Sequence, residues 1–209
     1  MPPSSEPGIP IVNVGYRSTN YWVVGARRSR ILFDLGWPGT MGAMLASMRR
    51  MSIPLAEIRF GLASHYHIDH AGLAQELRHA GVRLLVMETQ IGAILQMKAF
   101  TKPRDHYVEI TTDDVQPVCF EESRALLKEI GIAGEILSTP GHSDDSVSLL
   151  LDDGSVFTGD LPPEEIPEAG SPELVTASWR MLRERGARTV YPAHGPVRPM
   201  RARSALPSY

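Results

Sequence analysis

The heptapeptide S-H-Y-H-I-D-H constrains this chain more than any other stretch of it. It follows a short apolar run and carries four groups that can bind a metal: His65, His67, Asp69 and His70. One interpretation is an ordinary polar surface loop whose histidines form hydrogen bonds with neighbouring groups. Against it, crowded imidazoles and a carboxylate are costly if charged or unpaired, and a divalent cation removes that cost by binding neutral nitrogens and an ionised oxygen. The crowding therefore favours a metal site.

Three further donors follow strand-like runs elsewhere in the chain. His142 stands in T-P-G-H-S, Asp160 in V-F-T-G-D, and His194 in Y-P-A-H-G-P. The D-D-G turn between the apolar runs 147–151 and 155–158 predicts a hairpin, whose far ends bring His142 and Asp160 together. Strand-to-loop junctions are where α/β proteins place their chemistry, so these residues join the candidate site.

Asp34 closes the last of three early strand-like runs. These runs, at 9–15, 19–25 and 30–36, each end in glycine, and their regular spacing predicts an antiparallel sheet. The residues alone leave two readings of Asp34 open. It is either a turn-forming residue before Gly36 or a carboxylate that orients a ligand histidine from behind.

Helical and extended patterns alternate after this sheet. Methionines at three- and four-residue spacing after Pro38 predict a helix whose methionine stripe packs in the core. The remaining patterns predict a strand at 58–64, a helix at 71–80, a strand at 82–87, a helix at 121–130, a helix at about 171–185 and a last strand at 189–191. This alternation is typical of an α/β protein.

The stretch at about 88–120 breaks the regular pattern, and we interpret it as a lid. Insertions beside metal-binding loops are where substrate contacts tend to occur. Within it, Tyr107 is the polar aromatic residue best suited to donate a hydrogen bond to a substrate oxygen. The alternative is that Tyr107 is an amphipathic packing residue.

Length and composition limit the class of protein. The 209 residues, 43% hydrophobic and 22% charged, fit one soluble domain over residues 1–209. The chain start lacks the pattern of a signal or transit peptide, and no apolar run reaches membrane-spanning length. A net charge of −3 gives no long-range attraction for nucleic acid. We therefore expect no membrane partner and no nucleic-acid partner.

The single cysteine, Cys119, excludes an intrachain disulfide and indicates a reducing, cytoplasmic location. Its neighbours in P-V-C-F are apolar, which predicts a small buried hydrophobic residue and not a nucleophile.

The ordered set of motifs resembles the metallo-β-lactamase superfamily. The signature H-x-H-x-D-H is matched letter for letter, and Asp34, G-H-S, T-G-D and A-H-G accompany it in the family's order, over residues 31–195. The resemblance implies an α/β fold, an αβ/βα four-layer sandwich of two mixed β-sheets flanked by helices, with the metals at one edge.

The resemblance also implies a ligand set for two metal ions. His65, His67 and His142 would hold the first ion, and Asp69, His70 and His194 would hold the second. Asp160 would bridge both ions. Asp34 would hold residues 64–70, the histidine loop, in place without binding a metal. Zn²⁺ is the expected ion, with iron or manganese left open.

Such a pair of cations implies hydrolytic chemistry. Two cations about 4 Å apart can share a hydroxide at neutral pH and can polarise a carbonyl or phosphoryl oxygen. Asp69 is then the group expected to orient the hydroxide and relay its proton. Tyr107 would assist as a hydrogen-bond donor, as a tyrosine does in the related lactone hydrolases.

Differences from known subgroups of this superfamily reduce the number of activities that we expect for the chain. Asp160 stands where the best-studied zinc β-lactamases have a cysteine, and His67 stands where flavodiiron proteins have an acid. The chain lacks the second Gly-His of glyoxalase-II-like enzymes and the long basic arm of tRNA-processing endonucleases. We therefore expect a metal-dependent hydrolase of a small ester, thioester or lactone.

Other functions stay open on the same residues. One is a mononuclear iron oxygenase resembling the persulfide dioxygenases, and another is a phosphodiesterase or nuclease. A metal-binding scaffold without catalysis is disfavoured because no ligand position is lost. The short tail after His194 leaves little chain to cover the last strand, which favours a homodimer.

Overall fold

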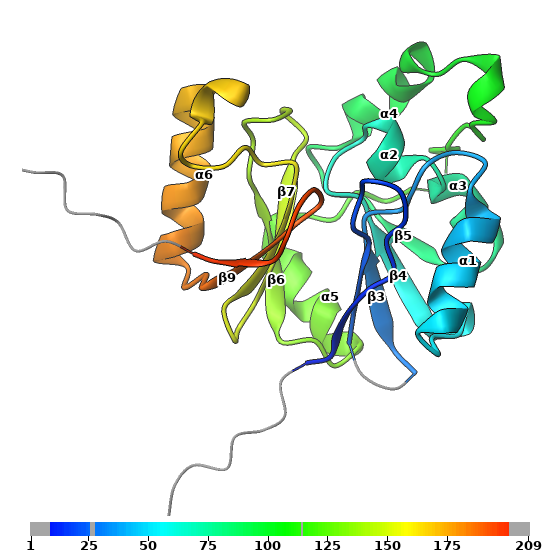
Figure 1. The fold of residues 1–209 in the computed structure, drawn as a ribbon, viewed down its shortest axis with the longest axis horizontal. Helices are drawn as coiled ribbons and strands as arrows, with labels where there is room; N and C mark the ends of the chain where they lie inside the picture. Colours follow the sequence, from blue (N-terminus) through cyan, green and yellow to red (C-terminus); the bar gives the residue numbers. More distant parts are fainter. Residues whose placement is uncertain (1–8, 26–27, 114, 201–209) are drawn as a thin grey trace, which may run out of the picture.

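Two five-stranded sheets lie face to face in a computed structural model of the chain, which describes residues 9–25, 28–113 and 115–200 (Figure 1). The first sheet has the order β1-β2-β3-β4-β5 and the second β10-β9-β8-β7-β6. The strands are β1 (Ile11–Asn13), β2 (Trp22–Val24), β3 (Arg30–Phe33), β4 (Ile58–Leu62), β5 (Arg83–Leu85), β6 (Gly134–Ser138), β7 (Val147–Leu151), β8 (Ser155–Gly159), β9 (Thr189–Pro192) and β10 (Arg198–Pro199).

The first sheet is mixed. Strands β1, β2 and β3 pair antiparallel, which confirms the sheet predicted from the glycine-closed runs. Strands β3, β4 and β5 are parallel, because the chain returns through helices between them. Those helices are α1 (Met41–Arg50), α2 (Ile68–Ala71) and α3 (Ala74–His79). The predicted helix at 71–80 is therefore two short helices, and the first begins within the histidine motif.

The second sheet contains the predicted hairpin. Strands β7 and β8 pair antiparallel across the D-D-G turn, and β8 is parallel to β9 because helix α6 (Pro172–Glu184) connects them. Strand β10 pairs antiparallel with β9, with Arg198 opposite Val190. The expectation that little chain is left to cover the last strand was therefore wrong. A homodimer stays a prediction without that support.

The space between the sheets is filled by side chains that alternate along the strands. Ile31 and Phe33 of β3 point toward the second sheet, whereas Leu32 points to the helices outside. The rings of Phe33 and Phe157 meet across this interface with centroids 5.8 Å apart. The inner strands β2, β7 and β8 are buried on both faces and are therefore nearly continuous apolar runs.

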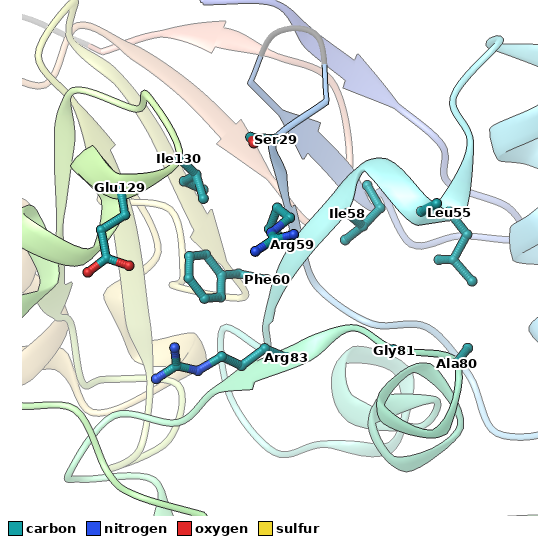
Figure 2. A pocket seen from close by; sticks show the side chains of 11 residues that line it. Ser29, Leu55, Ile58, Arg59, Phe60, Ala80, Gly81, Arg83, Glu129 and Ile130 are labelled. Carbon is teal, nitrogen blue, oxygen red and sulfur yellow. The ribbon is translucent and has the colours of Figure 1, made fainter.

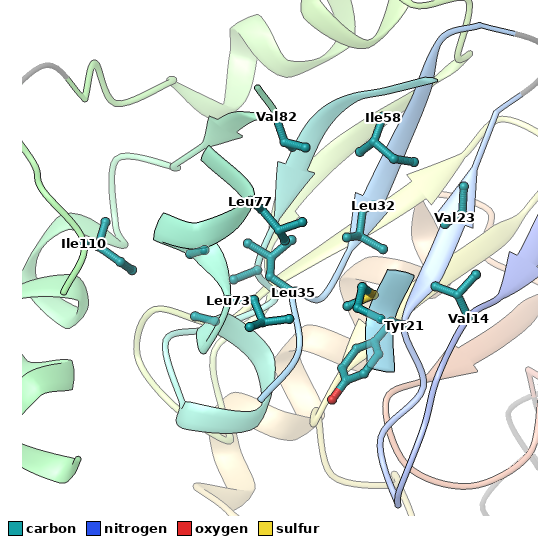
Figure 3. Packing of buried hydrophobic residues seen from close by; sticks show 14 of the residues in the cluster. Val14, Tyr21, Val23, Leu32, Leu35, Ile58, Leu73, Leu77, Val82 and Ile110 are labelled. Atoms are coloured by element: carbon teal, nitrogen blue, oxygen red, sulfur yellow. The ribbon is translucent and has the colours of Figure 1, made fainter. Parts of the chain in front are cut away.

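Helices cover the outer face of each sheet. On the first sheet, Leu73 and Leu77 belong to the same buried cluster as Leu32 (Figure 3), and Met44 and Met48 of α1 are buried in it as well. The methionine stripe is thus core, as predicted. On the second sheet, α6 packs through a second apolar cluster that includes Val175, Trp179 and Leu182. The layers confirm the αβ/βα sandwich.

The stretch from residue 88 to 120 is irregular, as expected. It contains α4 (Ile91–Met97) and several single turns, and Ile94 and Met97 anchor it in the core. Its role as a lid stays a prediction. Helix α5 (Ser123–Glu129) follows it. Among the helices of the described residues, none is long and apolar enough to span a bilayer.

Cys119 is exposed, so its predicted burial was wrong. The preceding residue, Val118, pairs with Met87 and is buried. In extended backbone, neighbouring side chains point to opposite sides, and the apolar neighbours of Cys119 therefore turn it outward.

Candidate metal centre

Seven nitrogen and oxygen donors meet at one edge of the sandwich. They follow the ends of β4, β6, β8 and β9 or lie on α2. Figure 1 shows the position of α2 above β4. The turn after β4 carries His65 and His67, and α2 carries Asp69 and His70. The remaining three follow the second sheet's strands: His142 lies between β6 and β7, Asp160 directly after β8 and His194 just after β9. We call these residues the seven donors.

One group of donors consists of three histidines. The ligand nitrogens of His65, His67 and His142 all lie within 4.8 Å of one another. Nε2 of His142 is 3.1 Å from Nδ1 of His67. This group matches the set expected to hold the first metal.

A second group joins a carboxylate to two histidines. Oδ2 of Asp69 lies 3.3 Å from Nε2 of His70 and 3.4 Å from Nε2 of His194. Asp160 stands between the groups, with Oδ2 3.3 Å from Nε2 of His70 and 3.7 Å from Nε2 of His142. Its Oδ1 is 3.3 Å from Nε2 of His194. The structure therefore brings all seven donors together.

Buried donor atoms in this cluster lack hydrogen-bond partners. Within the described residues, Nε2 of His65, Nε2 of His70 and Oδ1 of Asp160 make no well-aligned hydrogen bond, although the last two lie 3.3 Å from another donor of the cluster. Leaving such an atom unpaired costs about 1–3 kcal/mol, and more for a charged group. Divalent cations between the atoms would satisfy them all, so the donor set fits metal ions that prefer imidazole and carboxylate ligands.

The Nδ1 atoms of three ligand histidines contact neighbouring protein groups outside the cluster. Nδ1 of His65 lies 3.0 Å from Oγ of Ser64, and Nδ1 of His194 donates to the carbonyl oxygen of Ser18 at 2.7 Å. Nδ1 of His70 lies 3.1 Å from Oδ2 of Asp34. Holding one ring nitrogen fixes the tautomer and directs the other nitrogen into the site.

Asp34 contacts the histidine loop at two points. Besides its contact with His70, its Oδ1 accepts a hydrogen bond from the backbone N–H of Ser64 at 2.8 Å. The residue is fully buried, with φ of 66°. Aspartate is one of the few residues enriched in this left-handed region. These contacts match the orienting role expected of Asp34.

Burial and neighbouring charges shift the pKa values of the donors. Burial and the nearby His70 lower the pKa of His65 well below its ordinary value. Burial also opposes charge on His70, but Asp34, Asp160 and Asp69 outweigh it and raise the pKa of His70 well above its ordinary value. For Asp69, burial raises the pKa, yet His70 outweighs it and lowers it to about 2. The neutral His65 and ionised Asp69 are the forms that bind metals.

Two buried residues that the sequence analysis missed hold the histidine loop. Oδ2 of Asp145 accepts a hydrogen bond from the backbone N–H of Tyr66 at 2.8 Å. The side-chain amide of Gln90 donates to the carbonyl oxygens of Ala63 at 3.0 Å and Asp145 at 3.3 Å. An acid close after His142 was visible in G-H-S-D-D-S, whereas nothing in the sequence marked Gln90.

Tyr107 lies outside these contacts. Its hydroxyl accepts a hydrogen bond from the backbone N–H of Ile110 at 3.4 Å, and its ring packs against the core under the first sheet's helices. Burial raises the pKa of Tyr107. Its role as a hydrogen-bond donor to substrate stays a prediction.

Two cavities flank the donors. One, of about 430 Å³, is lined by His142, Asp160 and His194 together with apolar residues. The other, of about 370 Å³, lies beside His67 and is bounded by α4 and by residues 143–145. A third cavity, of about 340 Å³, is formed around β4, β5 and α5 (Figure 2), and none of the seven donors lines it.

Comparisons with known proteins agree with this geometry. A lactamase-like protein of Trichophyton equinum is 29% identical over 185 residues, which are 87% of this chain and 49% of that protein. An atrochrysone carboxyl ACP thioesterase of Aspergillus terreus is 27% identical over 188 residues, 87% of this chain and 50% of that protein. The chain thus spans about half the length of these curated relatives.

A solved structure shares the fold. A metallo-beta-lactamase family protein from Thermus thermophilus superposes with a TM-score of 0.67 over 91% of this chain and 73% of that one, at 20% identity. The sequence model of the metallo-beta-lactamase superfamily matches residues 14–194. The chain therefore belongs to the metallo-beta-lactamase superfamily.

Proposed function

We propose that this protein is a hydrolase that binds two divalent metal ions, with Zn²⁺ the expected ion, and cleaves a small ester, thioester or lactone. The observation that carries the proposal is the convergence of the seven donors on one edge of the sandwich. As a member of this superfamily, the chain is an enzyme of the hydrolase type.

In this proposal the donors divide between two ions. His65, His67 and His142 would hold one ion, Asp69, His70 and His194 would hold the other, and Asp160 would serve both. When bound, the ions supply a nucleophile at neutral pH and polarise the substrate oxygen. The geometry of Asp160, within 3.7 Å of a histidine from each group, supports its shared role.

Other contacts in the site orient the ligand side chains and the attacking group. Asp69 has one oxygen near His70 and His194, and Oγ1 of Thr19 donates to that oxygen at 3.3 Å. This position supports Asp69 as the group that holds a proton during attack on the substrate. Asp34 and Ser64 keep the histidine rings in the orientation that binding requires.

A small acyl substrate is supported by two observations. Cavities on both sides of the donors give room for two arms of a substrate, one on each side of the bond that breaks. A relative over this matched part is a thioesterase by name. A cytoplasmic location and a homodimer remain part of the proposal, the former supported by the free thiol of Cys119.

Elemental analysis of protein purified without added metal tests the proposal first. We expect about two zinc ions per chain, as in two-metal hydrolytic sites. A panel of ester, lactone, thioester and phosphodiester substrates follows, with and without a chelator. We expect His67→Ala to abolish hydrolysis, whereas His79→Ala, which removes an exposed imidazole outside the seven donors, leaves it intact.

The alternatives give different results. Metal content well below one ion per chain, or full activity in His67→Ala, would contradict the proposal. A single iron with oxygen consumption on a thiol-derived substrate would instead identify an oxygenase. Cleavage of phosphodiesters only, with salt-dependent binding of RNA, would identify a nuclease.

A further inference from the structure

The cavity beside His142, Asp160 and His194 has an unusual lining. Apart from those three donors, it is walled by four prolines with Leu161, Ala169 and Gly159. The one remaining lining residue is Arg198. Arg198 is therefore the only positively charged side chain, apart from the histidines, in the lining of this cavity. The other residues around it, except the three donors, are apolar.

Arg198 is held in place by the second sheet and α6. It lies on β10, opposite Val190 of β9, and its guanidinium carbon is 5.4 Å from the centre of the Trp179 ring. Trp179 is buried, and its indole N–H donates to the carbonyl oxygen of Pro162, a residue of the same cavity, at 2.7 Å. A cation stacked on a fixed indole is oriented before any ligand arrives.

No carboxylate pairs with Arg198 among the described residues. Nearby arginines differ, because Arg183 contacts Glu164 at 2.5 Å and Arg185 contacts Glu135 at 2.9 Å. Asp160 is the only carboxylate in the cavity lining, and its oxygens face His70, His142 and His194. Among the described residues, the half-buried Arg198 thus has no carboxylate partner, and it lines a cavity beside the candidate metal site.

We propose that Arg198 binds a carboxylate of the substrate, so that the enzyme acts on an ester or thioester of a short dicarboxylic acid. This inference rests on the proposed hydrolase function and names its substrate class. The planar guanidinium matches a carboxylate through two parallel hydrogen bonds. The proline and leucine walls suit the methylene chain between that carboxylate and the scissile carbonyl at the metals.

A pair of matched esters tests the inference in the metal-loaded protein. The mono-4-nitrophenyl ester of glutaric acid carries a terminal carboxylate, and 4-nitrophenyl pentanoate has the same chain length without it. We expect Arg198→Gln to lower kcat/KM for the glutarate ester by about 10- to 100-fold, mainly through KM, and to leave the pentanoate within about twofold.

Two further variants separate recognition from net charge. Arg198→Lys keeps the charge but not the planar fork, so it should recover part of the lost kcat/KM. Arg180→Gln removes one exposed positive charge from the same helix that carries Trp179 and should have no effect on either ester. An equal loss on both esters in Arg198→Gln would reject carboxylate recognition. A preference for a phosphonate-terminated ester over the glutarate would reject the carboxylate as the group bound.

A binding experiment on the metal-free protein keeps this test independent of catalysis. Glutarate should shift the NMR signal of the Trp179 indole N–H in a saturable way in the wild-type protein but not in Arg198→Gln. If neither ester is hydrolysed but this shift occurs, the hydrolase proposal fails and the carboxylate site stands. If both esters are hydrolysed without dependence on Arg198 and glutarate gives no shift, the carboxylate site fails and the hydrolase stands.

Discussion

The carboxylate of Asp34 lies 3.1 Å from Nδ1 of His70, and both side chains are fully buried. The residues are 36 positions apart, yet the parallel pairing of β3 with β4 delivers both to the same edge of the first sheet. Asp34 thus links the end of one strand to the donors that follow the next. Four predictions rest on contacts of this kind.

Asp34→Asn should weaken metal binding by about 10- to 100-fold, because the charge that orients His70 is lost. Asparagine tolerates the positive φ of this position and keeps an oxygen for the N–H of Ser64, so the fold should survive. Competition with a chromophoric chelator measures the affinity. Asp152→Asn, which alters an exposed ion pair with Arg124, is the control and should bind metal normally.

Gly159→Ala should both destabilise the protein and displace Asp160. The added Cβ would clash with Oγ of Ser64, at a φ of 53° that alanine adopts only with strain. We expect a loss of about 2–4 kcal/mol in the free energy of unfolding, from overpacking together with the backbone cost. Urea unfolding and metal content are measured. Gly131→Ala has a similar positive φ but open space, so it should retain its metal and lose only the backbone part.

Gln90→Leu should cost about 2–4 kcal/mol of unfolding free energy, because it leaves buried partners unsatisfied. The fully buried amide serves the carbonyl oxygens of Ala63 and Asp145 and the backbone N–H of Met87. Chemical denaturation gives the value. The same change at the exposed Gln116 should stay within about 0.5 kcal/mol of the wild type. If Gln90→Leu is as stable as Gln116→Leu, the hydrogen bonds of the Gln90 side chain do not contribute to stability.

If Tyr107 is only the packing residue that its core contacts indicate, Tyr107→Phe should leave kcat/KM within about threefold of the wild type, because the substitution keeps the ring. Steady-state kinetics on the best substrate of the panel measures the effect, and Tyr107→Ala shows what loss of the ring itself does. A fall of about 100-fold or more in Tyr107→Phe, with unchanged metal content, would support the role of hydrogen-bond donor to the reacting oxygen.

Local patterns in the sequence were sufficient for most elements. Short apolar runs, closing glycines and the D-D-G turn predicted strands β1 to β4 and the β7–β8 hairpin, because backbone geometry and turn chemistry act between neighbours in the chain. The prediction that Cys119 is buried was wrong, because local patterns do not determine which side of a segment faces the core. Its apolar neighbours indicate a buried segment, but which side of an extended segment faces inward is decided by its partner, here Met87.

The sequence by itself determined the seven donors and their order, because residue type and motif spacing carry that information. Local periodicity indicated an α/β protein, and the sandwich followed from the resemblance of the ordered motifs to a known superfamily. The tertiary structure decided which atoms face each other: Gln90 with Ala63 and Asp145, Gly159 with Ser64, and Arg198 with Trp179. Such contacts join positions 19 to 95 residues apart. They depend on sheet register and packing, which arise only when the whole chain has folded.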